Sequence, residues 1–203
     1  ILSLDTDINN SNTLYISNTQ ATNFTAISTT TLRNPPSITD EGDYAVYVGN
    51  DDHIRGILLD GTSQETIISL NSIWSNVAIS KDGNRIAAIT TSQDTSIWII
   101  DIASGQAAKF KLSNPSFTQG LSSGDVLFAD ALEWDYTGEY VVYDALNRIN
   151  GLSGQAIEYW DVGVCDCGIA SLRICVFSHS FYASMVEIAL FSDHPPTHPA
   201  NSM

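Results

Sequence analysis

The sequence predicts an all-β fold assembled from repeated four-stranded antiparallel units, and two observations support this prediction. Of the 203 residues, 43% are hydrophobic and 9% aromatic, and the frequent Thr, Ser, Ile, Val and Tyr favour strands. A short strand, a glycine turn and a second strand also recur three times, at residues 37–47, 78–89 and 132–143. Such hairpins, recurring at a regular period, indicate a β-repeat architecture.

Three turn glycines, Gly42, Gly83 and Gly138, align the repeats. Glycine supplies the positive φ of a tight hairpin turn, and neighbouring acidic or Asn side chains bond to the backbone there. Gly83 follows Gly42 by 41 residues and Gly138 follows Gly83 by 55, whereas propeller repeats span about 40–50 residues. The longer spacing requires an insertion, which the Pro-, Gly- and Ser-rich segment 113–124 supplies.

Strand and turn signals along the chain then define each unit in order. Residues 13–17 and 23–28 are predicted to be the last two strands of a first, partial unit. Two complete units follow, and the final unit has a third strand at 156–161 with no clear fourth. The predicted order is a partial blade at 1–32, blades at 33–72 and 73–112, an inserted loop at 113–127 and a blade at 128–163. We therefore expect an incomplete or truncated β-propeller of four-stranded antiparallel blades.

Residues 79–89, Ile-Ser-Lys-Asp-Gly-Asn-Arg-Ile-Ala-Ala-Ile, resemble the Ser-Pro-Asp-Gly-Lys-x-Ile-Ala-Phe repeat of TolB-like, WD-repeat-like β-propellers. Residues 96–101, Ser-Ile-Trp-Ile-Ile-Asp, are similar to the Ile-Trp-x-Val-Asp strand of the same family, and the resemblance extends over residues 12–163. Lys81 replaces the usual Pro, and Glu41 and Thr137 precede the turn glycine where Asp is usual. The resemblance implies a propeller fold.

The composition changes abruptly at residue 164. The tail at 164–203 holds all three cysteines and three of the four histidines. Three interpretations compete: a metal site, a single disulfide with one leftover thiol, or a non-repeat tail whose end at 192–203 is disordered. We favour the third, because the cysteine spacing does not match a zinc knuckle. The apolar run at 169–190 could then pack against the last blade as a strand pair or a short helix. The residues concerned are Cys165, Cys167, Cys175, His179, His194 and His198.

Charge and hydropathy disfavour several classes of partner. The net charge of −15 repels nucleic acid and anionic lipid, and no stretch approaches the roughly 18 apolar residues of a membrane span. We therefore expect no nucleic-acid partner and no membrane insertion. The first residues lack the basic and apolar regions of an export signal, and we interpret the chain as a fragment or a mature form that works extracytoplasmically, in the periplasm or secreted.

The sequence offers no catalytic set. It contains no Gly-x-x-x-x-Gly-Lys and no His-Glu-x-x-His motif, and we assign no catalytic residue, cofactor or metal ligand. Residues 5–11 resemble the opening of a calcium loop, but Ile16 stands where the Glu ligand belongs, and an Asx-rich turn is the better interpretation.

Several polar and aromatic residues are candidates for a binding site. We expect His53 to be a solvated turn residue and the tryptophans to form the core between blades. An acidic rim at the blade ends could collect a cation or a basic peptide, although solvated turn carboxylates are commoner. The rim residues are Asp130, Glu133, Asp135 and Asp144, and the tryptophans are Trp74, Trp98, Trp134 and Trp160.

These observations favour a non-catalytic propeller segment that serves as a scaffold for a protein or peptide partner. This hypothesis comes from the analogy of fold and not from identified site residues. One alternative is the propeller domain of a larger enzyme, such as a prolyl-oligopeptidase-like serine peptidase whose nucleophile lies in another domain. A sugar- or metal-binding propeller is a third hypothesis.

Overall fold

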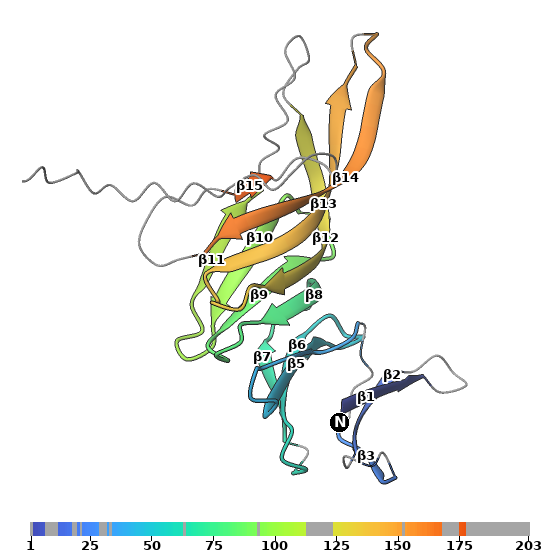
Figure 1. Ribbon diagram of the computed structural model, residues 1–203, viewed down its shortest axis with the longest axis vertical. Coiled ribbons are helices and arrows are strands. Elements are labelled where there is room, and N and C mark those ends of the chain that lie inside the picture. The colour runs from blue at the N-terminus through green and yellow to red at the C-terminus, as the bar shows by residue number, and fades with distance from the viewer. Residues whose placement is uncertain are drawn as a thin grey trace, which may run out of the picture.

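A computed structural model describes most of the propeller-like region. The described residues are 2–6, 12–17, 20, 22–28, 32, 34–62, 64–92, 94–112, 124–151, 153–167 and 175–177. They form four antiparallel sheets that follow one another along the chain (Figure 1). No helix long and apolar enough to cross a bilayer occurs in this part of the chain.

Within each sheet the strands are hydrogen-bonded in chain order, so that each sheet is a simple up-and-down meander. The first sheet has three strands and each of the others has four. The strands are β1 (Leu2–Thr6), β2 (Asn12–Ser17), β3 (Phe24–Ala26); β4 (Ser37–Ile38), β5 (Tyr44–Val48), β6 (Ile54–Leu58), β7 (Glu65–Ser69); β8 (Trp74–Ile79), β9 (Arg85–Thr90), β10 (Ser96–Asp101), β11 (Ala107–Lys111); β12 (Asp125–Trp134), β13 (Tyr140–Asn150), β14 (Ala156–Asp166) and β15 (Cys175–Phe177).

The predicted glycine turns join the first two strands of each four-stranded sheet. Gly42, Gly83 and Gly138 have φ angles of 69°, 74° and 71°, which confirms the positive φ expected of them. Each glycine N–H donates to the carbonyl oxygen of the residue three positions earlier. The three turns therefore share one geometry.

The sheets are stacked face to face, and adjacent residues of one strand enter different cores. In β9, Ile86 and Ala88 pack into the core shared with β5, which contributes Val46. Ala87 and Ile89 point to the other face and pack with residues of β12. A strand that is buried on both faces loses the polar alternation of a half-exposed strand, and this explains the apolar sequence of 86–89.

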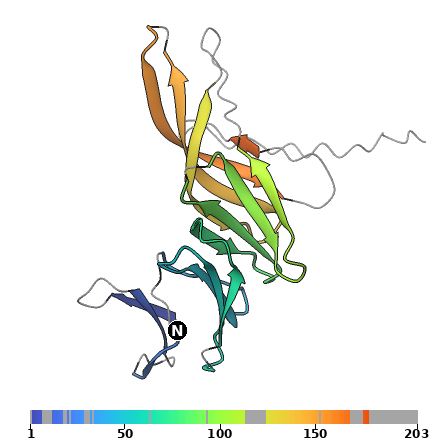
Figure 2. The same cartoon turned by 180° about the vertical axis from the view of Figure 1, so that it is seen from behind.

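The stack forms an open array in both views (Figures 1 and 2). The β1–β3 sheet lies at one end and the β12–β15 sheet at the other. Strands β13 and β14 are 11 residues each and extend as a hairpin beyond the sheet that precedes them.

One strand count and two boundaries differ from the sequence prediction. The first unit has three strands, because β1 pairs with β2 in addition to the two strands expected. Strand β12 begins at Asp125, within the segment predicted as an inserted loop at 113–127, of which 113–123 lie outside the described residues.

The end of the last unit also differs from the prediction. Strand β14 continues through residue 164 to Asp166, and β15 supplies the fourth strand that the sequence did not reveal. The predicted boundary after residue 163 was therefore wrong, because the long β13–β14 hairpin keeps its register past it. The segments 168–174 and 178–203 of the predicted tail lie outside the described residues.

Two strand glycines lie under tyrosine rings, and they differ in how far the ring can move. A Cβ added at Gly163 would overlap the ring of Tyr143, which is 1% exposed, and a Cβ at Gly56 would overlap the phenol of the half-buried Tyr44. We expect Gly163→Ala to lower the free energy of unfolding by about 3 kcal/mol and Gly56→Ala by about 1 kcal/mol, because the buried ring cannot retreat. Urea denaturation measures both values, and equal losses would contradict this account.

Candidate binding surface at the glycine-turn edge

The three glycine turns lie along one edge of the stack, here called the glycine-turn edge (residues 39–44, 80–85 and 135–140). The N–H of Asp40 donates to the carbonyl oxygen of Lys81, a bond of 3.1 Å that joins the first turn to the second. The Lys81 ammonium lies 3.0 Å from a carboxylate oxygen of Glu133, at the end of β12. Backbone and side-chain contacts thus hold consecutive turns side by side.

Short polar side chains stabilise each turn from within. The Thr39 hydroxyl donates to Asp43 at 2.6 Å, and the Ser80 hydroxyl donates to Asp82 at the same distance. In the third turn Asp135 accepts bonds from the hydroxyl and the N–H of Thr137. These bonds fix the direction of the carboxylates, so the edge presents rigid acidic groups.

Hydrogen bonds hold the pKa of two of these carboxyls below the ordinary value. For Asp82 the bond from the Ser80 hydroxyl is the main cause, and partial burial opposes it. For Asp135 burial is the largest influence and raises the pKa, but the donors from Thr137, Tyr140 and Glu139 together outweigh it. Both carboxyls are anionic at neutral pH.

Two consecutive sheets meet along a line that reaches the glycine-turn edge, here called a seam. Arg85 closes the seam between the third and fourth sheets. Its guanidinium donates to the carbonyl oxygen of Gly138 and, at 3.0 Å, to that of Cys167. It also lies 4.9 Å from the centre of the Trp134 ring. Two carbonyl acceptors and an aromatic face are a complete setting for a guanidinium.

The equivalent seam between the second and third sheets is open. It holds a pocket of about 350 Å³, with Tyr44 and Leu58 on one side and Gly83 on the other. The carboxylates of Glu41, Asp43 and Asp82 surround it, all on exposed residues, and Thr39 and Lys81 complete the lining.

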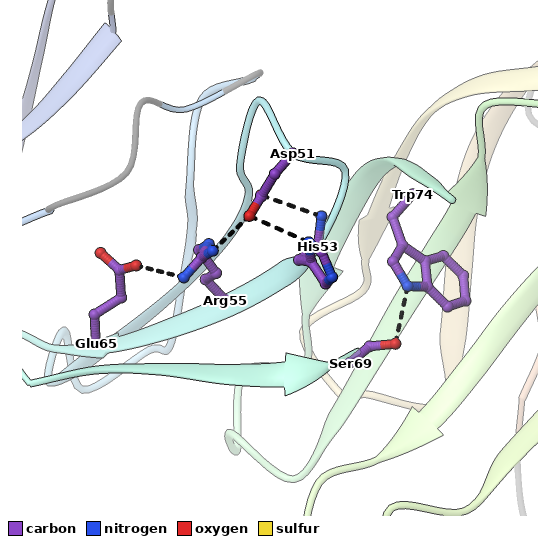
Figure 3. A network of polar contacts seen from close by, with 6 residues as sticks. All are labelled: Asp51, His53, Arg55, Glu65, Ser69 and Trp74. Carbon is purple, nitrogen blue, oxygen red and sulfur yellow. Dashed lines mark hydrogen bonds and ion pairs between the residues drawn. The ribbon is translucent and has the colours of Figure 1, made fainter. Parts of the chain in front are cut away.

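A second polar cluster lies at the opposite turn of the second sheet (Figure 3). Arg55 bridges two carboxylates, at 2.6 Å from Asp51 and 2.8 Å from Glu65. The Arg55 and Glu65 side chains are 13% and 7% exposed, so this ion pair is largely buried. Burial, helped by Glu65, raises the pKa of Tyr47 well above its usual range. The cluster faces the core shared with the first sheet, and we assign it a structural role.

His53 belongs to this cluster, which corrects the prediction of a solvated turn residue. Its Nδ1 lies 3.2 Å from Asp51, and its side chain is 24% exposed. The sequence indicated the turn correctly but could not show that Asp51 would contact both His53 and Arg55.

Three of the four acidic residues predicted as a rim, Glu133, Asp135 and Asp144, have separate structural contacts. Asp144 accepts bonds from the N–H groups of Asp130 and Ala131, at the bulge between Ala129 and Leu132 where β12 loses register with β13. Glu133 pairs with Lys81, and Asp135 stabilises its own turn. The described residues contain no group of three or more His, Cys, Asp or Glu side chains arranged to hold a metal ion.

Three of the four tryptophans lie at the cores between sheets, as the sequence predicted. Trp74 and Trp98 meet edge to face, with ring centroids 6.1 Å apart, and Trp134 is 2% exposed in the core. Trp160 does not follow the prediction, since it is 52% exposed and packs against Phe128 on the outer face of the last sheet. The sequence repeat does not show which face of a sheet packs against a neighbouring sheet and which face is exposed.

The cysteine-rich segment is part of the last sheet. Cys165 and Cys167 are buried, and Cys165 pairs in register with Cys175 across β14 and β15. His179 lies outside the described residues. So do positions 7–11 of the calcium-like segment, whose first two residues, Asp5 and Thr6, belong to β1.

Comparisons with known proteins support the architecture. No family model and no curated protein matches the sequence. Among solved structures, TolB from Acinetobacter baumannii superposes with a TM-score of 0.60 at 13% identity, and putative TolB from Agrobacterium tumefaciens with 0.56 at 14%. The fold is part of a β-propeller. Each four-stranded sheet is therefore a blade, as the sequence predicted.

The blades make up a fraction of the proteins they resemble. Each TolB match covers 87% of this chain, but 39% of the Acinetobacter and 61% of the Agrobacterium protein. An acylaminoacyl peptidase in complex with a chloromethyl ketone also matches, with a TM-score of 0.52 at 13% identity, over 87% of this chain and 30% of the peptidase. Identities this low establish the fold alone.

Replacing Arg85 tests the clamp between the last two blades. We expect Arg85→Met to lower the free energy of unfolding by about 2–3 kcal/mol, because two carbonyl oxygens lose a charged donor. Arg85→Lys should recover less than half, since an ammonium lacks the planar fork. The control is Arg148→Met, which removes an exposed ion pair with Glu158 and should cost less than about 0.5 kcal/mol. Similar losses at both positions in urea denaturation would refute the clamp.

The lowered carboxyl pKa values predict a fall in stability at acid pH. A folded-state pKa below the ordinary 3.8 means that the unfolded chain binds protons first as the pH falls. The stabilisation is therefore fully present above about pH 4 and is lost as the pH falls through the folded pKa of Asp82. Asp82→Asn should reduce the dependence of the unfolding free energy on pH between 2 and 5. An NMR titration that places the Asp82 pKa above 3.8 would contradict this expectation.

Proposed function

We propose that these blades are a non-catalytic binding scaffold for a protein or peptide partner, and that the glycine-turn edge is the surface that binds it. The observation that carries the proposal is the pocket between Tyr44 and Gly83, open at an edge whose backbone is held by bonds between turns. A rigid edge that presents an open pocket loses little conformational entropy on binding.

The charge of the chain indicates the character of the partner. With 23 acidic and 8 basic residues, the protein attracts cationic groups, and the pocket concentrates three carboxylates at one place. This favours a protein or peptide with basic side chains. It also supports the expectation that nucleic acid is not the partner.

The likeness to TolB supports the scaffold proposal through the fold. The likeness to an acylaminoacyl peptidase supports the alternative proposal. In that proposal these blades belong to a larger serine peptidase whose nucleophile lies in another domain. A Gly-x-Ser-x-Gly segment followed by Asp and His in the flanking coding sequence would favour the peptidase. An extracytoplasmic location, periplasmic or secreted, remains part of the proposal and is testable by fractionating cells that make the full protein.

Peptide selection on the purified chain tests the binding function. We expect a displayed random-peptide library to yield binders, and hydrogen exchange of the complexes to show new protection at residues 39–44 and 80–85. Binders that protect the opposite turns, near residue 51, would overturn the assignment of the edge. A chain that retains its unfolding transition yet selects no peptide would overturn the scaffold function itself.

A further inference from the structure

The repeat places equivalent residues at equivalent seams. Two positions after the turn glycine stands Tyr44 in the first turn, Arg85 in the second and Tyr140 in the third. Arg85 reaches across its seam to the next turn glycine, Gly138. Tyr44 has the same position in the second sheet and faces the seam between the second and third sheets. Across that seam, Gly83 corresponds to Gly138.

Tyr44 does not fill its seam as Arg85 does. Its phenol lies over Gly56 of its own blade, and its ring packs against the core formed with the third blade. The pocket opens between Tyr44 and Gly83, and Gly83 is the counterpart of the Gly138 that Arg85 reaches one seam further along. The seam that has Tyr44 in place of Arg85 therefore keeps an open pocket beside its turn glycine.

The walls of this pocket suit a cation that is carried on an apolar stem. Tyr44 and Leu58 provide an aromatic ring and an aliphatic side chain, and Leu58 is 37% exposed although it is apolar. Glu41, Asp43 and Asp82 provide negative charge. The basic residue of the lining, Lys81, is engaged by Glu133 at 3.0 Å, which offsets its charge. An arginine matches this combination of an apolar wall and an anionic rim.

We propose that this pocket binds the guanidinium of an arginine side chain on a protein or peptide partner, in the position that Arg85 occupies in the following seam. The inference rests on the proposed binding function and specifies the partner. The arginine stem lies along Tyr44 and Leu58, and the guanidinium meets the carboxylates at the rim. An arginine in trans then joins the second and third blades as Arg85 joins the third and fourth.

A pair of labelled peptides tests the proposal directly. Fluorescein-labelled Gly-Ser-Arg-Ser-Gly and its citrulline counterpart differ by the charge of one group of nearly the same shape. We expect fluorescence anisotropy to show binding at least about tenfold tighter for the arginine peptide, the effect of one hydrogen-bonded charge. We also expect the arginine peptide to shift the NMR amide signals of residues 40–44 and 81–85.

Filling the pocket in cis provides the decisive variant. Tyr44→Arg places a guanidinium where Arg85 stands in the next seam, and it should weaken binding of the arginine peptide at least about tenfold. Tyr140→Arg is the matched control, since it makes the same change at the equivalent position of the last described turn and should leave binding unchanged. Glu41→Gln, at an exposed residue, should weaken binding without altering the unfolding transition.

The outcomes separate this inference from the proposed function. Equal affinity for the arginine and citrulline peptides, or equal effects of Tyr44→Arg and Tyr140→Arg, would overturn the arginine pocket. Peptides selected from the random library could still protect the glycine-turn edge in that case, and the scaffold function would stand. Should Tyr44→Arg fail to fold, Glu41→Gln decides, and unchanged affinity in that variant would overturn the inference.

Discussion

Burial of both faces of the two inner sheets is the constraint on which the rest of the structure depends. Alternate residues of β9 enter two separate cores, and β5 does the same, with Val46 in the core shared with the third blade and Tyr47 in the core shared with the first. A single four-stranded sheet with such strands would expose apolar surface on both sides. The blades are therefore stable as a stack, and each seam contributes to the stability of two blades.

The stack also creates the candidate site. Because consecutive blades pack in the same way, their glycine turns lie side by side and each seam reaches the edge with the same geometry. The side chain two positions after the glycine then decides whether that seam is closed. Arg85 closes one by bonding to the next turn, whereas Tyr44 stays over its own blade and leaves the preceding seam open. A structural clamp and the candidate pocket thus arise from one repeat.

Other polar groups that the sequence singled out serve the sheets themselves. Asp144 bonds to the backbone at a bulge, and Asp135 fixes the turn of the last blade. Arg55 and Glu65 form a largely buried ion pair, which is maintained because removing one partner would leave the other charge buried alone. The acidic character of the surface therefore has two origins: carboxylates with backbone partners, and carboxylates such as Glu41 that line the open pocket.

The sequence by itself determined the all-β class, the glycine turns and the identity of most strands, because these depend on local φ preferences and on apolar patterning. It left open whether the apolar run at 169–190 forms a strand pair or a short helix, and only the pairing with β14 shows that residues 175–177 are a strand. Likewise, Trp160 follows the repeat but meets no neighbouring blade among the described residues.

The tertiary structure alone decided the site. The alignment of Tyr44 with Arg85 is visible in the sequence, but the pocket depends on where each side chain goes once two blades are packed. The turns at Gly42 and Gly83 are 41 residues apart in the chain and become neighbours through the stacking of the sheets. Local sequence patterns specify each hairpin, whereas the space between hairpins follows from long-range packing.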